Sequence, residues 1–179
     1  MKSQDFSLLP FASICPLPEV NIIGTVGRRD EVLYLEYDFL GLTEAIAVPA
    51  LAAMPVRRDG LWNETCFELF LGPDKSDRYW EFNFSPAGHW NVYSFEAYRQ
   101  GMREEQAFSS LPFSVEICPD ALHLSVELDL EKIIPRDQSL KIGISAVVRS
   151  SAGDCTYWAL THPGPQPDFH RKDGFIIEC

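Results

Sequence analysis

Two carboxylates and one amide alternate with apolar residues in two neighbouring strand-like runs. Thr65 to Leu71 carries Glu68, and Tyr79 to Ser85 carries Glu81 and Asn83. Successive side chains of a strand point to opposite faces, so a hairpin that keeps the apolar residues together places these three polar side chains on the other face. The register that does so pairs Leu71 with Trp80, Leu69 with Phe82 and Phe67 with Phe84.

A polar group held beside aromatic rings is suited to a neutral polyol. Carboxylates and amides exchange hydrogen bonds with neighbouring hydroxyls, while flat rings stack on the apolar faces of a sugar. Phe70 and Tyr93 are expected on the same face as Glu68 and Glu81, with Arg149 within reach of the two carboxylates. The alternative is an ordinary exposed sheet face, or ion pairs between the two glutamates and Arg57, Arg58 or Arg149.

Tryptophans supply the candidate stacking platforms. Trp62 precedes a strand and stands outside the alternation, and Trp158 lies in a late strand beside the loop that runs from 162 to 170. We take these two as the expected pair, with Trp90 in reserve and Trp80 assigned to the core. The complete predicted ligand-binding set is Arg57, Trp62, Glu64, Glu68, Glu81, Asn83, Tyr93, Arg149, Trp158, His162 and His170.

The late segment from Thr161 to His170 holds three residue types that can ligate metals, at His162, Asp168 and His170. Their spacing matches no compact metal motif, and three prolines make the segment stiff rather than helical. We therefore expect a polar loop that closes over the rim of a binding cleft, with neither a metal nor a cofactor.

The elements that must position these groups are short strands separated by proline and glycine. Val20 to Val26 and Val32 to Phe39 form a predicted hairpin, and Leu122 to Leu130 alternates apolar and polar residues throughout. Further strands are predicted at Trp90 to Phe95, Leu140 to Arg149, Thr156 to Thr161 and Phe175 to Ile177. The stretch 44–54 is predicted to be a loop with at most one helical turn, and the stretch 96–106 to be a short helix or an irregular excursion.

This pattern predicts an all-β chain, an antiparallel β-sandwich of jelly-roll type with little helix, and a closed barrel is the alternative. We expect one domain over residues 1–179, with 1–19 as an irregular N-terminal arm. The predicted core contains Phe67, Leu69, Trp80, Phe82, Leu124, Val126 and Leu128.

Two stretches resemble the strand motifs of DOMON-like proteins related to family 9 carbohydrate-binding modules. They run from Arg57 to Phe70 and from Tyr79 to Trp90, and Tyr157 to Leu160 matches a late Tyr-Trp-Ala-Leu segment. The resemblance covers most of the chain from about Val20 onward. It implies a β-sandwich that binds sugar, in some relatives by clamping a terminal residue between two tryptophans, while other DOMON relatives bind haem.

Composition and charge narrow the classes of partner. The 179 residues are 46% hydrophobic and 23% charged, with a net charge of −11. A strongly acidic surface repels phosphate backbones and anionic lipids, so we expect neither nucleic acid nor a membrane as partner. The N-terminus lacks a secretory pattern, and the five cysteines form no tight pair, which indicates reduced thiols and a cytoplasmic location.

Three functional classes remain open. The first is binding of a sugar or other small polyol without chemistry, so the protein is expected not to be an enzyme. The second is an enzyme acting on a sugar, with Glu68 and Glu81 as the carboxylate pair. The third is a haem-binding domain, with Met54, Met102 and the four histidines as axial ligand candidates. The sequence leaves the oligomeric state open.

Overall fold

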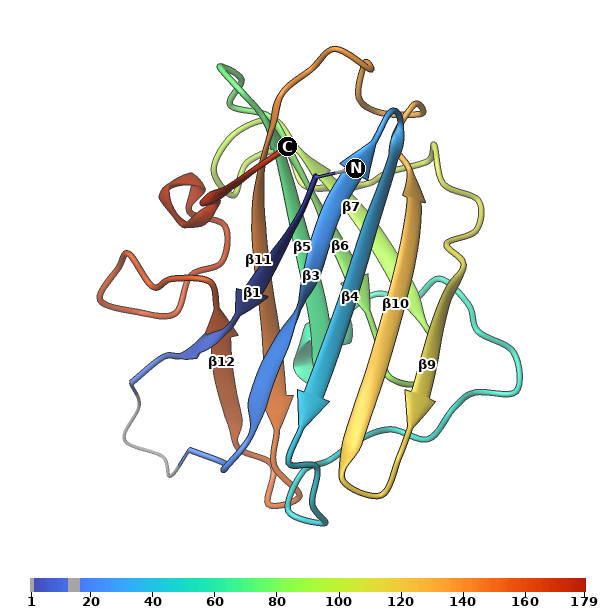
Figure 1. Ribbon diagram of the computed structural model, residues 1–179, viewed down its shortest axis with the longest axis vertical. Coiled ribbons are helices and arrows are strands. Elements are labelled where there is room, and N and C mark those ends of the chain that lie inside the picture. Colours follow the sequence, from blue (N-terminus) through green and yellow to red (C-terminus); the bar gives the residue numbers. More distant parts are fainter. Residues whose placement is uncertain (1, 13–16) are drawn as a thin grey trace.

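Two antiparallel sheets packed face to face form the molecule, as the computed structural model shows for residues 2–12 and 17–179 (Figure 1). This confirms the predicted antiparallel β-sandwich. Helix is limited, among the described residues, to two single 3-10 turns, η1 (Leu61–Asn63) and η2 (Lys172–Gly174).

The first sheet has five strands. Their order across the sheet is β1 (Lys2–Ser7), β3 (Asn21–Arg29), β4 (Val32–Leu40), β10 (Ala121–Asp129) and β9 (Phe113–Ile117). The predicted alternation in β10 is present: its apolar side chains are buried and its polar side chains are exposed. This sheet therefore has one dry face and one face in water.

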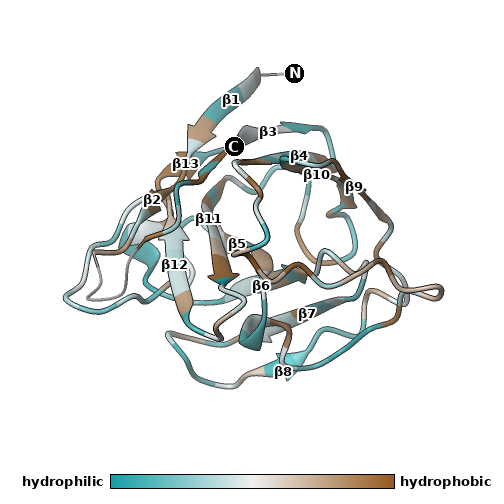
Figure 2. Ribbon diagram, turned by 90° about the horizontal axis from the view of Figure 1, so that it is seen from below, coloured by the Kyte–Doolittle hydropathy of each residue, from teal (hydrophilic) through white to brown (hydrophobic). Residues whose placement is uncertain are grey.

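The second sheet has eight strands. Seven follow the order β2 (Leu9–Pro10), β12 (Cys155–Ala159), β11 (Leu140–Arg149), β5 (Cys66–Pro73), β6 (Tyr79–Phe84), β7 (Trp90–Phe95) and β8 (Arg103–Glu104). The eighth, β13 (Ile177–Glu178), pairs with the start of β11. Figure 2 shows β11, β5, β6 and β7 as the layer facing the five-stranded sheet.

The main core lies between the two sheets. All seven residues predicted to be buried there are at most 3% exposed: Phe67, Leu69, Trp80, Phe82, Leu124, Val126 and Leu128. A hydrogen bond also crosses this core, because the hydroxyl of Tyr37 on β4 donates to the backbone carbonyl of Glu68 on β5 over 2.7 Å. Strand β5 is thereby fixed to both sheets.

The N-terminal stretch differs from the expectation of an irregular arm. Residues 2–7 form β1, which pairs with β3, and residues 9–10 form β2, which pairs with β12. Both are edge strands, which need few apolar side chains, so their period-two pattern is weak. The same reason explains why β8 and β9 were not predicted. Residues 1 and 13–16, including Cys15, lie outside the described residues.

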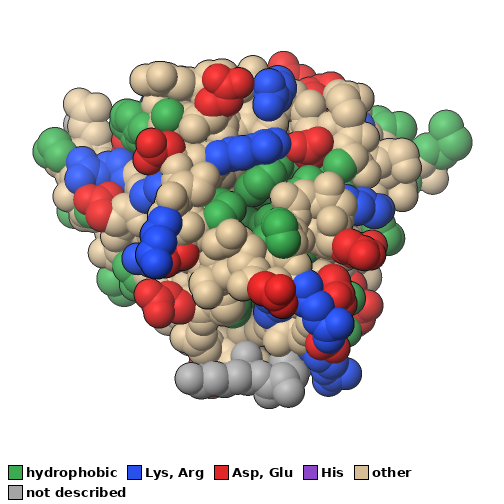
Figure 3. All heavy atoms as spheres, turned by 90° about the horizontal axis from the view of Figure 1, so that it is seen from above, with side chains coloured by type: hydrophobic (Ala, Val, Ile, Leu, Met, Phe, Trp, Pro, Cys, Tyr) green, Lys and Arg blue, Asp and Glu red, His purple; other side chains and the backbone are tan. Residues whose placement is uncertain are grey.

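The surface carries both signs of charge. At the end of the molecule seen in Figure 3, acidic and basic side chains are interspersed around a small apolar patch. Over the described part of the chain, no helix is long and apolar enough to cross a membrane.

Candidate functional site

The predicted polar residues lie together on the outer face of the eight-stranded sheet. The register of β5 and β6 is the predicted one, with Leu71 opposite Trp80, Leu69 opposite Phe82 and Phe67 opposite Phe84. Glu68 lies opposite Asn83, and the amide of Asn83 donates to Glu81 Oε1 over 2.8 Å. From β11, the hydroxyl of Ser145 donates to Glu68 Oε2 over 3.0 Å. The shared face of Glu68, Glu81 and Asn83 is therefore confirmed.

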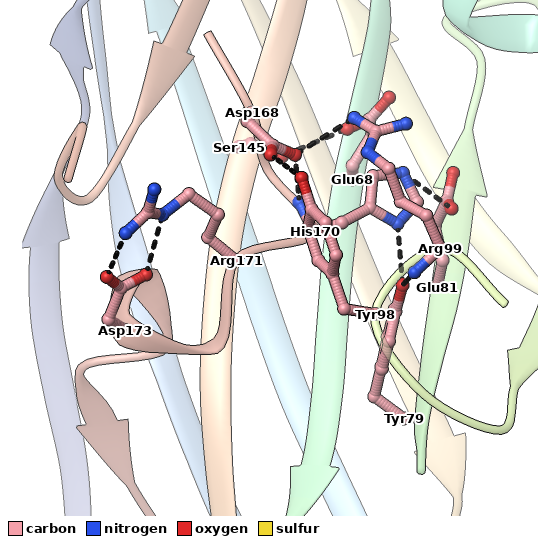
Figure 4. A network of polar contacts seen from close by, with 10 residues as sticks. All are labelled: Glu68, Tyr79, Glu81, Tyr98, Arg99, Ser145, Asp168, His170, Arg171 and Asp173. Atoms are coloured by element: carbon pink, nitrogen blue, oxygen red, sulfur yellow. Dashed lines mark hydrogen bonds and ion pairs between the residues drawn. The ribbon is translucent and has the colours of Figure 1, made fainter. Parts of the chain in front are cut away.

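This outer face is buried. Glu68 is 3% exposed, Glu81 4% and Asn83 0%, although no second sheet packs on this side. The cover is the stretch of residues 161–175 between β12 and β13, called here the closing segment. Figure 4 shows its Asp168 and His170 beside the two glutamates.

The closing segment is seated by an aromatic ring on glycine. Phe175 lies against Gly143 on β11, where an added Cβ would stand 2.6 Å from the ring, and against Gly72 on β5. Its ring centroid is 5.6 Å from that of Phe70. A side chain at Gly143 would therefore push the ring off the sheet, so this glycine provides a flat seat for the segment.

Asp168 ties the closing segment to the loop between β7 and β8. The guanidinium of Arg99 donates to Asp168 Oδ1 over 2.9 Å, and the hydroxyl of Tyr98 donates to Oδ2 (Figure 4). Despite partial burial, these hydrogen bonds lower the pKa of Asp168, which keeps it ionised. The tie is formed by exposed partners, since the side chain of Arg99 is 52% exposed.

His170 is neutral and lies between Tyr79 and Glu81. Burial, and then the charge of Arg99, lower its pKa to about 4. Its Nδ1 is 2.9 Å from the hydroxyl of Tyr79, which also accepts the backbone N–H of Arg99 over 3.1 Å. Its Nε2 is 3.7 Å from Glu81 Oε2.

Burial raises the pKa of both glutamates. For Glu68 the negative charge of Glu81 raises the pKa further, while the hydrogen bond from Ser145 and the charge of Arg99 lower it. For Glu81 the hydrogen bond from Asn83 and then Arg99 oppose the effect of burial. Desolvation prevails in both, so the pair favours a state that retains a proton.

Aromatic rings surround the pair, and a second polar group adjoins it. The rings belong to Trp62, Phe70, Tyr79, Tyr93, Phe95, Phe169 and Phe175. The hydroxyl of Tyr93 donates to Asp59 Oδ1 over 2.5 Å and accepts from Asn91 Nδ2 over 2.8 Å. Under the closing segment, a cavity lined by Phe70, Ser145 and Asp168 has a volume of about 10 Å³, room for about one water molecule.

Trp158 is not on this face, which corrects its assignment as a platform. It is 4% exposed in the main core, and its indole N–H donates to Thr156 over 3.0 Å. Alternation along β12 instead turns Tyr157 outward, where its ring centroid is 6.1 Å from that of Phe169. Trp62 does adjoin the site: its ring centroid is 5.7 Å from that of Tyr93.

Arg149 had been expected beside the two carboxylates, but it lies elsewhere. It donates to the backbone carbonyl of Asn63 over 3.2 Å and, with Glu64, lines a separate surface depression of about 440 Å³. Arg99 takes the predicted role, because its charge lowers the pKa of both Glu68 and Glu81. Arg99 lies on an irregular loop, where no periodic pattern could place it.

Of three further predicted residues, Arg57 reaches the edge of the site at Asn91, whereas Trp90 and His162 lie elsewhere. Arg57 lies with its guanidinium carbon 4.4 Å from the centre of the Trp90 ring and donates to Asn91 Oδ1 over 2.7 Å. Trp90, the reserve platform, is itself 5% exposed in the core. His162 contacts the backbone carbonyl of Leu9, 2.8 Å away, so it does not join His170.

Several residues of the site were not predicted. They are Asp59, Tyr79, Asn91, Tyr98, Arg99, Ser145 and Asp168, the last having been considered only as a metal ligand. Alternation could have found Tyr79, Asn91 and Ser145, because each has the outward parity of its strand. Asp59, Tyr98 and Arg99 lie in loops that carry no such signal.

The ligand sets suggested for metal or haem are dispersed. Within the described residues, no group of three or more histidine, cysteine or acidic side chains is placed to hold a metal ion. Met54 and Met102 are 78% and 47% exposed. Neither methionine lies in an enclosed pocket where it could approach an iron.

Comparison with known proteins gives a likeness of structure. No family model and no curated protein match the chain. A protein of Bacteroides uniformis ATCC 8492 described as a candidate carbohydrate-binding protein superposes with a TM-score of 0.74 at 14% identity, over 96% of this chain and 83% of that one. Family 9 carbohydrate-binding modules of Caldicellulosiruptor kristjanssonii, in complex with glucose or with cellotriose, give TM-scores of 0.48 and 0.49 at 12% and 11% identity. They match 84% of this chain and 71% and 70% of their own.

Proposed function

We propose that the protein binds a sugar or other small polyol on the outer face of the eight-stranded sheet, beneath the closing segment, and catalyses no reaction. The observation that carries the proposal is a row of hydrogen-bonding side chains across four adjacent strands. Ser145, Glu68, Asn83 and Asn91 stand side by side on β11, β5, β6 and β7. Burying four polar groups costs hydration, which hydrogen bonds to the hydroxyl groups of a ligand would recover.

The chemistry of this row suits hydroxyl groups. An amide both donates and accepts, a serine hydroxyl does the same, and a carboxyl that retains a proton gains a donor. The neighbouring rings of Trp62 and Tyr93 offer apolar surface for the C–H faces of a sugar. Trp62 is only partly buried, as expected of a ring that is to meet a ligand.

The likeness to known structures supports the same conclusion. The Bacteroides uniformis protein shares the fold and is described as a candidate carbohydrate-binding protein. The strand motifs from Arg57 to Phe70 and from Tyr79 to Trp90 support placing the chain with DOMON-like proteins, a relationship that we also propose. Fold alone does not fix a ligand, so the polar row remains the principal argument.

Entry of a sugar requires the closing segment to move. The cavity beneath it has room for about one water molecule, far less than a sugar ring needs. Its tie at Asp168 depends on Arg99, whose side chain is 52% exposed, and ion pairs with such a partner contribute little to stability. We therefore place the ligand between the sheet and a displaced stretch around residues 168–170.

A panel of monosaccharides and disaccharides tests the proposal by calorimetry and tryptophan fluorescence. The informative variant is Ser145→Ala, which should weaken sugar binding about 3- to 10-fold through loss of one hydrogen bond. Ser125→Ala is the matched control, because Ser125 occupies an exposed outer-face position on β10, where it bonds Ser114. No binding by any sugar, or equal affinity of Ser145→Ala and wild type, would contradict the proposal.

A sugar-acting enzyme is the second candidate, favoured by the raised pKa of Glu68 and Glu81. A glycosidase needs one such carboxyl as general acid, but it also needs an ionised partner. Here burial raises the pKa of both, which places the enzyme behind the binding protein. Hydrolysis of any aryl glycoside by the wild type, abolished in Glu81→Gln, would reverse this order.

A further inference from the structure

We infer that the site prefers a sugar carrying a positively charged amine, whose ammonium group lies between Glu68 and Glu81, over the corresponding neutral sugar. The inference rests on the proposed function, because it assumes that the ligand of this face is a sugar. It names the class of that ligand from the charge and the free hydrogen-bonding capacity of the pair.

Each of the two carboxyl groups has an oxygen to spare. Ser145 serves Glu68 Oε2 and Asn83 serves Glu81 Oε1. Among the described residues, Glu68 Oε1 has no hydrogen-bond partner, and Glu81 Oε2 faces His170 Nε2 at 3.7 Å, beyond hydrogen-bonding distance. Two acceptor atoms on adjacent strands are therefore available to one donor group placed between them.

The basic side chains facing the pair are already occupied. The guanidinium of Arg99 lies 2.9 Å from Asp168 and neutralises the negative charge of that carboxylate. His170 is neutral, and its Nδ1 shares a hydrogen bond with the hydroxyl of Tyr79. The titratable and charged groups around the pair are Tyr37, Cys66, Tyr79, Tyr93 and Tyr157 from the strands, Arg99 from its loop, and Asp168 and His170 from the closing segment.

A ligand ammonium would supply the missing cation. In a buried setting an opposite charge within hydrogen-bonding distance stabilises an ionised carboxylate, so binding would release a proton from the pair. The rings of Phe70, Tyr79 and Tyr93 add attraction for a cation. A neutral sugar gains neither effect, and an anionic sugar would be repelled.

The test compares ligands that differ only in charge. Binding of glucosamine, glucose and N-acetylglucosamine is measured by calorimetry at about pH 6.5 in two buffers of different ionisation enthalpy. We expect glucosamine to bind at least about ten-fold more tightly than glucose, with release of about one proton per complex. N-acetylglucosamine, which keeps the nitrogen without its charge, should bind no better than glucose. Galactosamine and galactose provide a second matched pair.

Variants locate the effect. Glu81→Gln preserves shape and removes the charge, so it should reduce the ratio of glucosamine to glucose affinity to within about three-fold and abolish proton release. Glu68→Gln is the second isosteric variant, in case one of the two folds poorly. Glu127→Gln is the control, because Glu127 lies exposed on the outer face of β10 and should leave both the ratio and the proton release unchanged.

The outcomes separate this inference from the proposed function. Equal affinity for glucosamine and glucose, absence of proton release, or an undiminished preference in Glu81→Gln would overturn the ammonium site and leave sugar binding intact. Failure of every sugar would overturn the proposed function. Ethylammonium binding as tightly as glucosamine would contradict the preference for a sugar, since the hydroxyl groups would then contribute nothing.

Discussion

The two faces of the eight-stranded sheet are both buried, yet they are built from different residues. On β5 and β6 the inner face carries Phe67, Leu69, Trp80 and Phe82, which pack against the second sheet. The outer face of the same strands carries Glu68, Glu81 and Asn83 beneath the closing segment. All positions of β6 are buried on either side.

The comparison distinguishes apolar side chains, whose burial stabilises the fold, from carboxyl groups, whose burial reduces stability and changes their pKa. Apolar side chains lose nothing by leaving water, and their burial stabilises the fold. A carboxyl group loses hydration, which appears as the raised pKa of Glu68 and Glu81. A sheet face that retains such groups reduces the stability of the free protein, and a ligand can recover that free energy.

Truncating tryptophans should give the largest contrast between the faces. Trp80→Ala on the inner face should lower the free energy of unfolding by about 3–5 kcal/mol, as expected for a buried large aromatic. Trp62→Ala beside the outer face should lower it by about 1 kcal/mol, because that ring is partly exposed and makes one aromatic contact with Tyr93. Urea denaturation measures both changes.

Trp158→Ala belongs with the inner-face class and should match Trp80→Ala within about 1–2 kcal/mol. Sugar titration adds the second readout, since Trp62→Ala is expected to weaken binding while remaining folded. If Trp62→Ala destabilises the protein as much as Trp80→Ala, the ring belongs to the core and the contrast between the faces disappears.

The dependence of stability on pH should come from the outer face. Glu68 and Glu81 stay protonated in the folded protein at pH values where the unfolded chain has released its protons. Their contribution is complete below the ordinary pKa of about 4.3 and is lost as pH rises toward their raised pKa values. His170, with its pKa lowered to about 4, acts oppositely: its contribution is present above the ordinary value of about 6.5 and is lost as pH falls.

Above about pH 6.5, His170 therefore no longer offsets the loss of stability that Glu68 and Glu81 cause as the pH rises. The free energy of unfolding should fall by on the order of 1 kcal/mol per pH unit until the raised pKa values are reached. Denaturation at about pH 6.5 and 8 measures the slope, which Glu81→Gln should flatten and Glu127→Gln should preserve. A stability that rises over this interval would show that the two carboxyls are ionised in the folded state.

The smallest effect is expected at the tie between the closing segment and its loop. Asp168→Ala removes the contacts with Arg99 and Tyr98 and should cost about 0.5–1 kcal/mol, as exposed ion pairs do. Hydrogen exchange of backbone amides in residues 165–171 should nevertheless become faster. Asp173→Ala, which breaks the exposed pair with Arg171, is the control and should leave that exchange unchanged. Unaltered exchange in Asp168→Ala would mean that the other contacts of the segment, among them Phe175 on Gly143 and His170 with Tyr79, are enough to hold it.

Alternation was sufficient to predict the sandwich, the β5–β6 register and the shared face of Glu68, Glu81 and Asn83. It succeeded because a one-residue slip would have turned Phe67, Leu69, Trp80 and Phe82 together away from the facing sheet. Parity also explains the error at Trp158. The tryptophan was assigned by its chemistry, although Thr156 and Trp158 share the inner parity and leave Tyr157 facing outward.

The cover of the site lay beyond such reasoning. The contacts of Asp168 with Tyr98 and Arg99 join two irregular loops about 70 residues apart, and no local pattern specifies which loops meet. A polar loop over the cleft was expected from the prolines near His162, but its depth of closure depends on Phe175 resting on Gly143. That contact is a matter of shape, which a period-two pattern does not describe.

The closing segment lies late in the chain, so it is synthesised after the strands that it covers. Residues 161–175 follow β5, β6, β7 and β11, so the strands that carry Glu68, Glu81 and Ser145 emerge from the ribosome before anything can cover them. The contact between Tyr79 and His170 spans 91 residues, so it cannot form until the closing segment has been synthesised. Until then both carboxyls face water and are ionised at neutral pH. Docking of the segment therefore completes folding with an uptake of protons from solvent, and the acidity of the compartment acts on this final step.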